Sequence, residues 1–152
     1  MKFVELPGLT RVSRLGLGTW QFGSREWGYG DSYAEGEAGR ILDRALELGV
    51  TLIDTAEAYG FGRSERIVGA ALAGHRDGAY IATKYFPIAP IPGLVERHGR
   101  ASARRLEVEK IDLYQVHQPN PIIPDRLIMA GMRSLQDAGV VADVGVSNYS
   151  LG

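Results

Sequence analysis

Three features are missing from this 152-residue sequence, and each absence excludes a class of protein. There is no cysteine, which excludes a disulfide scaffold, a thiolate metal site and a cysteine nucleophile. No apolar run approaches the roughly 18 residues that span a bilayer. Neither sign of charge dominates, since 17 basic residues face 18 acidic ones, so nothing indicates a nucleic-acid or membrane partner. A small, neutral or locally steered partner fits this charge balance better.

The size and the apolar content indicate one folded domain. Apolar residues make up 45% of the chain, and a chain of this length buries roughly two thirds of its unfolded surface. The N-terminal stretch has a charge at Lys2 but no seven-residue apolar core before Glu5, unlike a signal peptide. We therefore expect a single soluble, cytoplasmic domain over residues 1–152.

Short apolar runs of strand length alternate with helical patterns along the chain. The runs are LGLGTW, VTLID, AYIATK, IDLYQVH and VGVSN. The clearest helical stripe has i, i+3, i+4, i+7, i+8 spacing and a closing glycine: Ala38, Ile41, Leu42, Ala45, Leu46 and Gly49. Ser64 stands where it could cap a second helix. Two further helices are predicted from Leu94 to Leu106 and from Ile128 to Ala138.

This alternation is typical of parallel strands covered by helices, which leaves an open doubly wound sheet and a (β/α)₈ barrel as alternatives. The polar ends of the five runs are Trp20, Asp54, Lys84, His117 and Asn148. They follow one another at intervals of 34, 30, 33 and 31 residues, without the long excursion expected where an open sheet reverses its strand order. The sequence therefore predicts a barrel of the TIM type, with about five of its eight strands.

A dinucleotide-binding fingerprint of the Rossmann type is not completed. Gly16 and Gly18 follow a strand, but the third glycine of that motif would stand at Gln21, and no helix begins there at once. The two glycines more plausibly let backbones pack closely at a strand end.

Polar residues end three consecutive runs. Asp54, Lys84 and His117 should converge, because the carboxyl ends of parallel strands meet at one rim, where ligands bind. Tyr59 lies in a loop that can fold over this rim. Taken singly, such residues are more often turn residues, solvated charges or loop hydrogen-bonding groups. Together they favour a chemical site.

These four side chains suit proton transfer to a carbonyl oxygen. A tyrosine phenol is a poor acid near neutral pH unless a neighbouring ammonium stabilises the phenolate, and Lys84 could supply that charge. Asp54 would orient Lys84, and His117 could hydrogen-bond a substrate oxygen or relay a proton.

The motifs LGLGTW, LIDTAEAYG with RSERIVGAAL, IATK, RRLEVEKIDLYQVHQP and GVSNYS together resemble those of the aldo-keto reductases, especially bacterial members, over nearly the whole chain. The resemblance implies a (β/α)₈ barrel that reduces aldehydes and ketones with NADPH, or occasionally NADH, and no metal.

The resemblance also implies individual roles. The family's catalytic tetrad falls on Asp54, Tyr59, Lys84 and His117, with Tyr59 as the proton donor. The cofactor-binding positions are expected at Thr19, Trp20, Asp54, Ser147 and Asn148, of which the last two would hold the nicotinamide carboxamide. Many relatives have tryptophan after the histidine, whereas Gln118 stands here, which bears on the substrate pocket and not on the tetrad.

The sequence stops after the fifth expected strand, and five strands cannot close a barrel. The family's positions for the pyrophosphate and the 2′-phosphate fall beyond Gly152. We therefore keep a second interpretation, a catalytically inactive half-barrel that acts as an assembly or binding module and associates with itself through open sheet edges. A third, a lyase or isomerase with Lys84 as a Schiff-base nucleophile, leaves Tyr59 and the Ser-Asn pair unexplained.

Overall fold

The computed structural model describes residues 1–5, 11–24, 32–74, 76–89 and 91–150. Five strands form one parallel sheet in the same order as in the chain. They are β3 (Gly16–Gly18), β4 (Leu52–Asp54), β5 (Tyr80–Tyr85), β6 (Ile111–Val116) and β7 (Val141–Val146). A doubly wound sheet would reverse its strand order, so the observed order confirms the choice of barrel topology.

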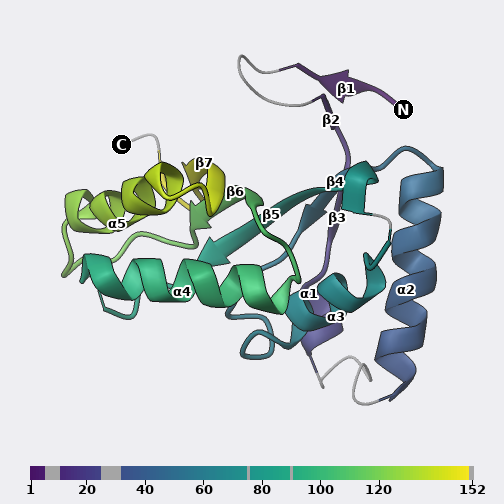
Figure 1. The fold of residues 1–152 in the computed structure, drawn as a ribbon, viewed down its shortest axis with the longest axis horizontal. Helices are drawn as coiled ribbons and strands as arrows, with labels where there is room; N and C mark the ends of the chain where they lie inside the picture. The colour runs from purple at the N-terminus through teal and green to yellow at the C-terminus, as the bar shows by residue number, and fades with distance from the viewer. Residues whose placement is uncertain (6–10, 25–31, 75, 90, 151–152) are drawn as a thin grey trace.

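Helices connect the strands and cover one face of the sheet. They are α1 (Trp20–Gly23), α2 (Ser32–Glu47), α3 (Arg63–Ala71), α4 (Pro92–Arg105) and α5 (Asp125–Asp137), with a short 3₁₀ turn at Arg76–Gly78. Figure 1 shows α5, α4, α3 and α2 following one another along the sheet, and each packs against the next. This one-sided arrangement is that of the wall of a barrel.

The core lies between the helices and the sheet, and it is formed by apolar residues of their facing sides. Ile53 and Ile81 are paired in register on neighbouring strands, and both are fully buried in a core that also contains Leu42 of α2 and Leu135 of α5. Because side chains alternate along a strand, Asp54 and Lys84 lie on the opposite face, which is the interior side of the barrel wall. The core thus directs the polar strand ends inward.

The predicted helix ends agree with the backbone. Gly49 and Gly139 follow α2 and α5 with φ of 79° and 72°, the left-handed conformation that glycine adopts without strain. Helix α4 begins at Pro92, two residues before the predicted Leu94, because a proline at the first helical position loses no hydrogen bond. Of the two early glycines, only Gly16 has the predicted close packing, since a Cβ there would lie 2.9 Å from Leu52, whereas at Gly18 it would meet open space.

Two features at the N-terminal side were not foreseen, whereas the open edges of the sheet were expected. Phe3–Val4 (β1) and Val12–Ser13 (β2) form a small antiparallel hairpin away from the parallel sheet (Figure 1). Trp20 begins α1 and does not end the strand as predicted, because the chain turns after Gly18. Strands β3 and β7 each have one neighbour only, so both have an unpaired edge in the described chain. Among the described helices, none has the length and apolarity to cross a membrane.

Candidate active site

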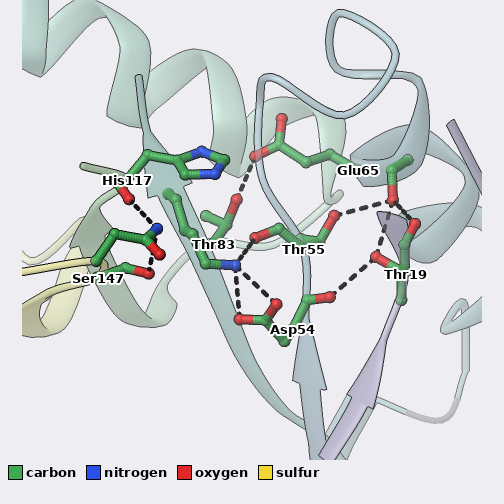
Figure 2. Close-up of polar contacts among 10 residues, drawn as sticks. Thr19, Asp54, Thr55, Glu65, Thr83, His117 and Ser147 are labelled. Carbon is green, nitrogen blue, oxygen red and sulfur yellow. Dashed lines mark hydrogen bonds and ion pairs between the residues drawn. The ribbon is translucent and has the colours of Figure 1, made fainter. Parts of the chain in front are cut away.

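Asp54 and Lys84 form an ion pair at the carboxyl ends of β4 and β5. The Lys84 Nζ lies 2.7 Å from both Asp54 carboxylate oxygens and also donates to the Thr55 carbonyl oxygen at 2.9 Å (Figure 2). The lysine side chain is only 7% exposed, whereas the Asp54 side chain is 37% exposed. A buried ammonium is held in place here by three acceptors that match its three N–H groups.

This arrangement bears on the Schiff-base interpretation of Lys84. A nucleophilic amine must be neutral and have a free lone pair. Lys84 instead donates to two carboxylate oxygens and one carbonyl oxygen. Its surroundings therefore favour a fixed positive charge over a nucleophile.

Tyr59 is held over the ion pair by a tightly built loop, residues 55–62, which we call the tyrosine loop. The Lys84 Nζ lies 5.3 Å from the centroid of the Tyr59 ring. Gly60, Phe61 and Gly62 all have positive φ, of 61°, 54° and 79°. Phe61 is not glycine and is 96% exposed, so this backbone shape costs free energy and is imposed by the surrounding contacts.

A close backbone contact with α1 fixes the same loop. A Cβ added at Gly23 would lie 2.6 Å from the Tyr59 carbonyl oxygen, and one at Gly60 would lie 2.4 Å from the Gly23 oxygen. Both distances are too short for any side chain. The end of α1 therefore packs directly against the backbone that carries Tyr59.

His117 completes the cluster from the end of β6. Its ring lies edge-on to Tyr59, with centroids 5.6 Å apart, and to Phe86, with centroids 5.7 Å apart. Its Nδ1 is buried without a hydrogen-bond partner among the described residues. Burial, and then the charge of Lys84, lowers the pKa of His117 from its usual 6.5, while Asp54 opposes the shift. The neutral imidazole is thereby favoured.

We expect the titration of His117, followed by NMR of the imidazole resonances, to have its midpoint below 6.5. In Lys84→Met the midpoint should rise, because one cause of the lowered pKa is removed. Lys110→Met is the control. It changes an exposed lysine directly before the start of β6, at the end of the strand away from His117, and should leave the His117 midpoint unchanged. An unaltered midpoint in Lys84→Met would contradict the electrostatic contact.

The lowered pKa also predicts how stability varies with pH. In the folded state the His117 ring is protonated only when the pH falls below 6.5, whereas in the unfolded chain it is protonated near pH 6.5. The contribution of the neutral ring to stability is therefore present above pH 6.5 and is lost as the pH falls through the folded pKa.

Three buried hydroxyl groups tie together the ends of β3 and β4 and the start of α3. Ser64 Oγ donates to the Thr19 carbonyl oxygen at 2.7 Å and lies 2.8 and 3.0 Å from the hydroxyls of Thr19 and Thr55. Thr19 also bonds the Asp54 carbonyl oxygen through both its N–H and its hydroxyl (Figure 2). All three residues are fully buried. This network fixes the backbone of Asp54.

The prediction that Ser64 caps α3 was wrong. The helix begins at Arg63 after Gly62, and no side chain caps it. Ser64 lies one residue inside the helix, where its hydroxyl faces the strand ends and has the partners just described. A serine ahead of an apolar stripe is typical of a cap, but here tertiary hydrogen bonds outweigh that preference.

The Ser-Asn pair lies beside His117 at the end of β7. Asn148 Nδ2 donates to the His117 carbonyl oxygen at 2.7 Å and lies 3.2 Å from Ser147 Oγ; His117 and Ser147 are labelled in Figure 2. Asn148 has φ of 61° and an exposed side chain. Trp20 is 48% exposed at the start of α1. The side-chain oxygen Oδ1 of Asn148 therefore remains able to accept a hydrogen bond from a bound molecule.

Sequence reasoning missed a second polar cluster on the helix side of β5. Glu65 of α3 is fully buried and accepts from Thr83 Oγ1 and Arg105 Nε, each at 2.6 Å. Glu57 of the tyrosine loop contacts His98 of α4. A signal for Glu65 was available, because it shares a helical face with Val68, Gly69 and Leu72 at spacings of 3, 4 and 7 residues.

The structure therefore brings together Asp54, Tyr59, Lys84 and His117, with Ser147 and Asn148 next to them. Thr19 is buried behind this group and contacts it through the Asp54 backbone. In the described part of the chain there is no cluster of three or more side chains that could hold a metal ion. The chemical roles of these residues remain predictions.

Comparison with known proteins gives a consistent result. Residues 14–152 match the model of the aldo/keto reductase family. The uncharacterized oxidoreductase Mb2320 of Mycobacterium bovis is 59% identical over 151 residues, which cover 99% of this chain and 47% of that protein. The methylglyoxal reductase YeaE of Escherichia coli is 32% identical over 147 residues, 97% of this chain and 49% of that protein.

Solved structures of this family confirm the fold. A thermostable aldo-keto reductase crystallised with the inhibitor epalrestat superposes with a TM-score of 0.88 at 33% identity, over 99% of this chain and 55% of that one. An aldo-keto reductase of Klebsiella pneumoniae in complex with NADPH gives 0.82 at 31% identity, over 93% and 47%. Aldo-keto reductases are (β/α)₈ barrels, so the five-stranded parallel sheet is an incomplete barrel.

The chain spans about half the length of the curated relatives that it matches. The match nevertheless extends over nearly all of its own residues, and it includes each of the strands that carry the polar cluster. The chain belongs to the aldo/keto reductase family and represents its N-terminal part.

Proposed function

We propose that this chain carries the catalytic half of an enzyme that reduces aldehydes or ketones with a hydride from NADPH. The observation that carries the proposal is the convergence of Tyr59, the buried Lys84 ammonium and the His117 ring around one point of the rim. Two relatives support the choice of reaction and cofactor, a protein named methylglyoxal reductase and a structure in complex with NADPH.

The residues divide the work as follows. The Tyr59 hydroxyl gives its proton to the carbonyl oxygen of the substrate, and the Lys84 ammonium, 5.3 Å from the ring centroid, stabilises the phenolate that remains. Asp54 keeps Lys84 oriented through two short contacts. The neutral imidazole of His117 donates a hydrogen bond that positions the substrate oxygen. Tyr59 regains its proton from solvent.

The nicotinamide, when bound, supplies the hydride that reaches the carbonyl carbon. Ser147 and Asn148 suit its carboxamide, because the Asn148 carbonyl oxygen can accept from the amide while Nδ2 stays on the His117 carbonyl oxygen. Trp20 offers an exposed aromatic wall at the same rim, and Thr19 supports Asp54 from behind. NADH is the alternative cofactor.

Titration of NADPH with this chain, followed by cofactor fluorescence with and without a broad-range aldehyde, tests the proposal. We expect saturable binding, and NADPH oxidation that depends on the aldehyde. Absence of binding at millimolar protein would contradict catalysis by this chain and favour the module interpretation.

The unpaired edges of β3 and β7 are the observation that favours the alternative, a half-barrel that serves assembly. Leu15 and Leu48, which are 65% and 55% exposed, add an apolar surface beside β3. Light scattering on the samples used for the NADPH titration gives the molar mass of the chain in solution and distinguishes the enzyme from the assembly module. Self-association without NADPH binding supports a module, whereas NADPH oxidation supports the enzyme in either oligomeric state.

A further inference from the structure

Glu57 links the tyrosine loop to two elements behind it. Its Oε1 accepts from the Phe86 backbone N–H at 2.7 Å, and its Oε2 lies 2.8 Å from Nδ1 of His98 on α4. Its own N–H donates to the Lys84 carbonyl oxygen at 3.3 Å. One carboxylate thus connects the loop that carries Tyr59, the residue after β5 and the helix outside it.

The surroundings of Glu57 are polar but largely closed to water. The Glu57 side chain is 11% exposed, and His98 is 29% exposed. Arg105 Nη2 lies 3.8 Å away, Glu65 lies beyond it, and Tyr85 packs edge-on against His98 at 5.4 Å. Burial raises the pKa of Glu57 from 4.5, and the Phe86 N–H and His98 oppose the shift. A carboxyl group is kept in this environment by specific partners.

The contacts of Glu57 lead to two aromatic neighbours of the His117 ring. Tyr59, two residues beyond Glu57, contacts that ring edge-on, and so does Phe86, whose N–H donates to Glu57. Other contacts hold each segment separately, such as the packing of Gly23 on the Tyr59 backbone and the Ile88 N–H bond to the Phe86 carbonyl oxygen, whereas the Glu57 carboxylate joins the tyrosine loop to the Phe86 backbone. Loss of the bridge would let both rings move relative to His117.

We propose that Glu57 is a positioning residue, which holds Tyr59 and Phe86 against His117 by bridging the Phe86 N–H and His98. The role rests on the proposed function only for its effect on catalysis. Its structural part can be measured on the chain without any turnover. Glu57 acts through the Phe86 N–H and through its own backbone in the tyrosine loop.

Three variants and one control test the bridge. Glu57→Ala removes it. Glu57→Gln keeps an acceptor for the Phe86 N–H and a polar partner for His98, so it should restore the geometry. His98→Ala removes one half of the bridge from a partly exposed position. Leu42→Ala, a buried change on α2, lowers stability without touching the bridge.

The first measurement is NMR titration of the three histidines, in which His98→Ala identifies one resonance by its loss. In Glu57→Ala we expect the His117 resonances to shift and the midpoint to move toward 6.5, because the ring becomes more hydrated. His98→Ala should give a smaller change in the same direction, and Glu57→Gln and Leu42→Ala should match the unaltered chain. The second measurement is turnover, where Glu57→Ala should lower kcat about 10- to 100-fold with KM for NADPH within about twofold.

Unchanged His117 resonances in folded Glu57→Ala would overturn the proposal, as would the same shift in Leu42→Ala. If Glu57→Ala does not fold, His98→Ala is the deciding variant. A shift of its His117 resonances supports the proposal, and unchanged His117 resonances overturn it. If the unaltered chain shows no turnover, the proposed function fails while the NMR result still decides the role of Glu57.

Discussion

Replacing Tyr59 by phenylalanine is expected to lower the rate of carbonyl reduction by about 10²- to 10⁴-fold, the usual contribution of a general acid. The substitution deletes only the hydroxyl group. The ring contacts with His117 and with the Lys84 ammonium involve the aromatic ring and are retained. NADPH affinity, measured by fluorescence, should therefore change little while kcat collapses.

Tyr114→Phe is the matched control for this variant. The Tyr114 hydroxyl is buried on the helix side of β6 and has no hydrogen-bond partner among the described residues, and burial raises its pKa well above 10. Its removal should leave the rate unchanged and should not lower stability. Carbonyl reduction at an undiminished rate in Tyr59→Phe would refute the assignment of the proton donor.

The largest effect on stability is expected at Glu65. Replacing it by alanine removes the acceptor of the buried Thr83 hydroxyl and of Arg105 Nε, and it leaves the partly buried guanidinium only Ser102 Oγ at 3.0 Å and the Glu57 carboxylate at 3.8 Å. Breaking a buried ion pair in this way costs about 3–5 kcal/mol. Since a domain is stable by only about 5–15 kcal/mol, urea unfolding followed by circular dichroism should detect a large loss.

Two further variants test whether the loss of stability comes from the broken ion pair. Glu109→Ala, which changes an exposed glutamate before β6, should shift the unfolding midpoint little. Replacing both partners together, Glu65→Leu with Arg105→Met, should restore much of the stability, because no unpaired charge remains. A loss below about 1 kcal/mol in Glu65→Ala would show that Arg105 finds another partner or solvent.

The polar residues at the carboxyl ends of the strands were predictable because the alternation of strand and helix patterns, and the spacing of the strand ends, can be read directly from the sequence. The near-constant spacing of Asp54, Lys84 and His117 predicted neighbouring parallel strands, and the sheet has that order. The strand ends and the following loop pointed to Asp54, Lys84, His117 and Tyr59, and the family resemblance added their assignment as a tetrad. The strand ends converge through the register that pairs Asp54 with Ala82 and Lys84 with Gln115.

The polar layer on the other side of the sheet could not be predicted in the same way. The apolar face that Glu65 shares indicated its burial, but nothing in the sequence identified Arg105, 40 residues away, as its partner. The pairing depends on the close approach of α3 to α4 at Gly69, where a Cβ would lie 2.7 Å from the Arg105 carbonyl oxygen. Such an approach is a property of the packed helices and not of either helix alone.

The N-terminal hairpin was missed for a related reason. Strands β1 and β2 have two residues each, too few for a periodic pattern. Ser13 connects the end of β2 to the start of β4, since its hydroxyl accepts from the N–H groups of Thr51 and Leu52. Its place is fixed by these tertiary bonds.

The most direct test of the account is isotope transfer. The chain is incubated with an aldehyde and with NADPH that carries deuterium at both positions of the nicotinamide C4, and the alcohol product is analysed by mass spectrometry. We predict an alcohol that has gained one deuterium, and at least about 100-fold less of it per unit time with Tyr59→Phe at the same protein concentration. No alcohol from the unaltered chain, or an alcohol without deuterium, would contradict carbonyl reduction by hydride transfer at this site.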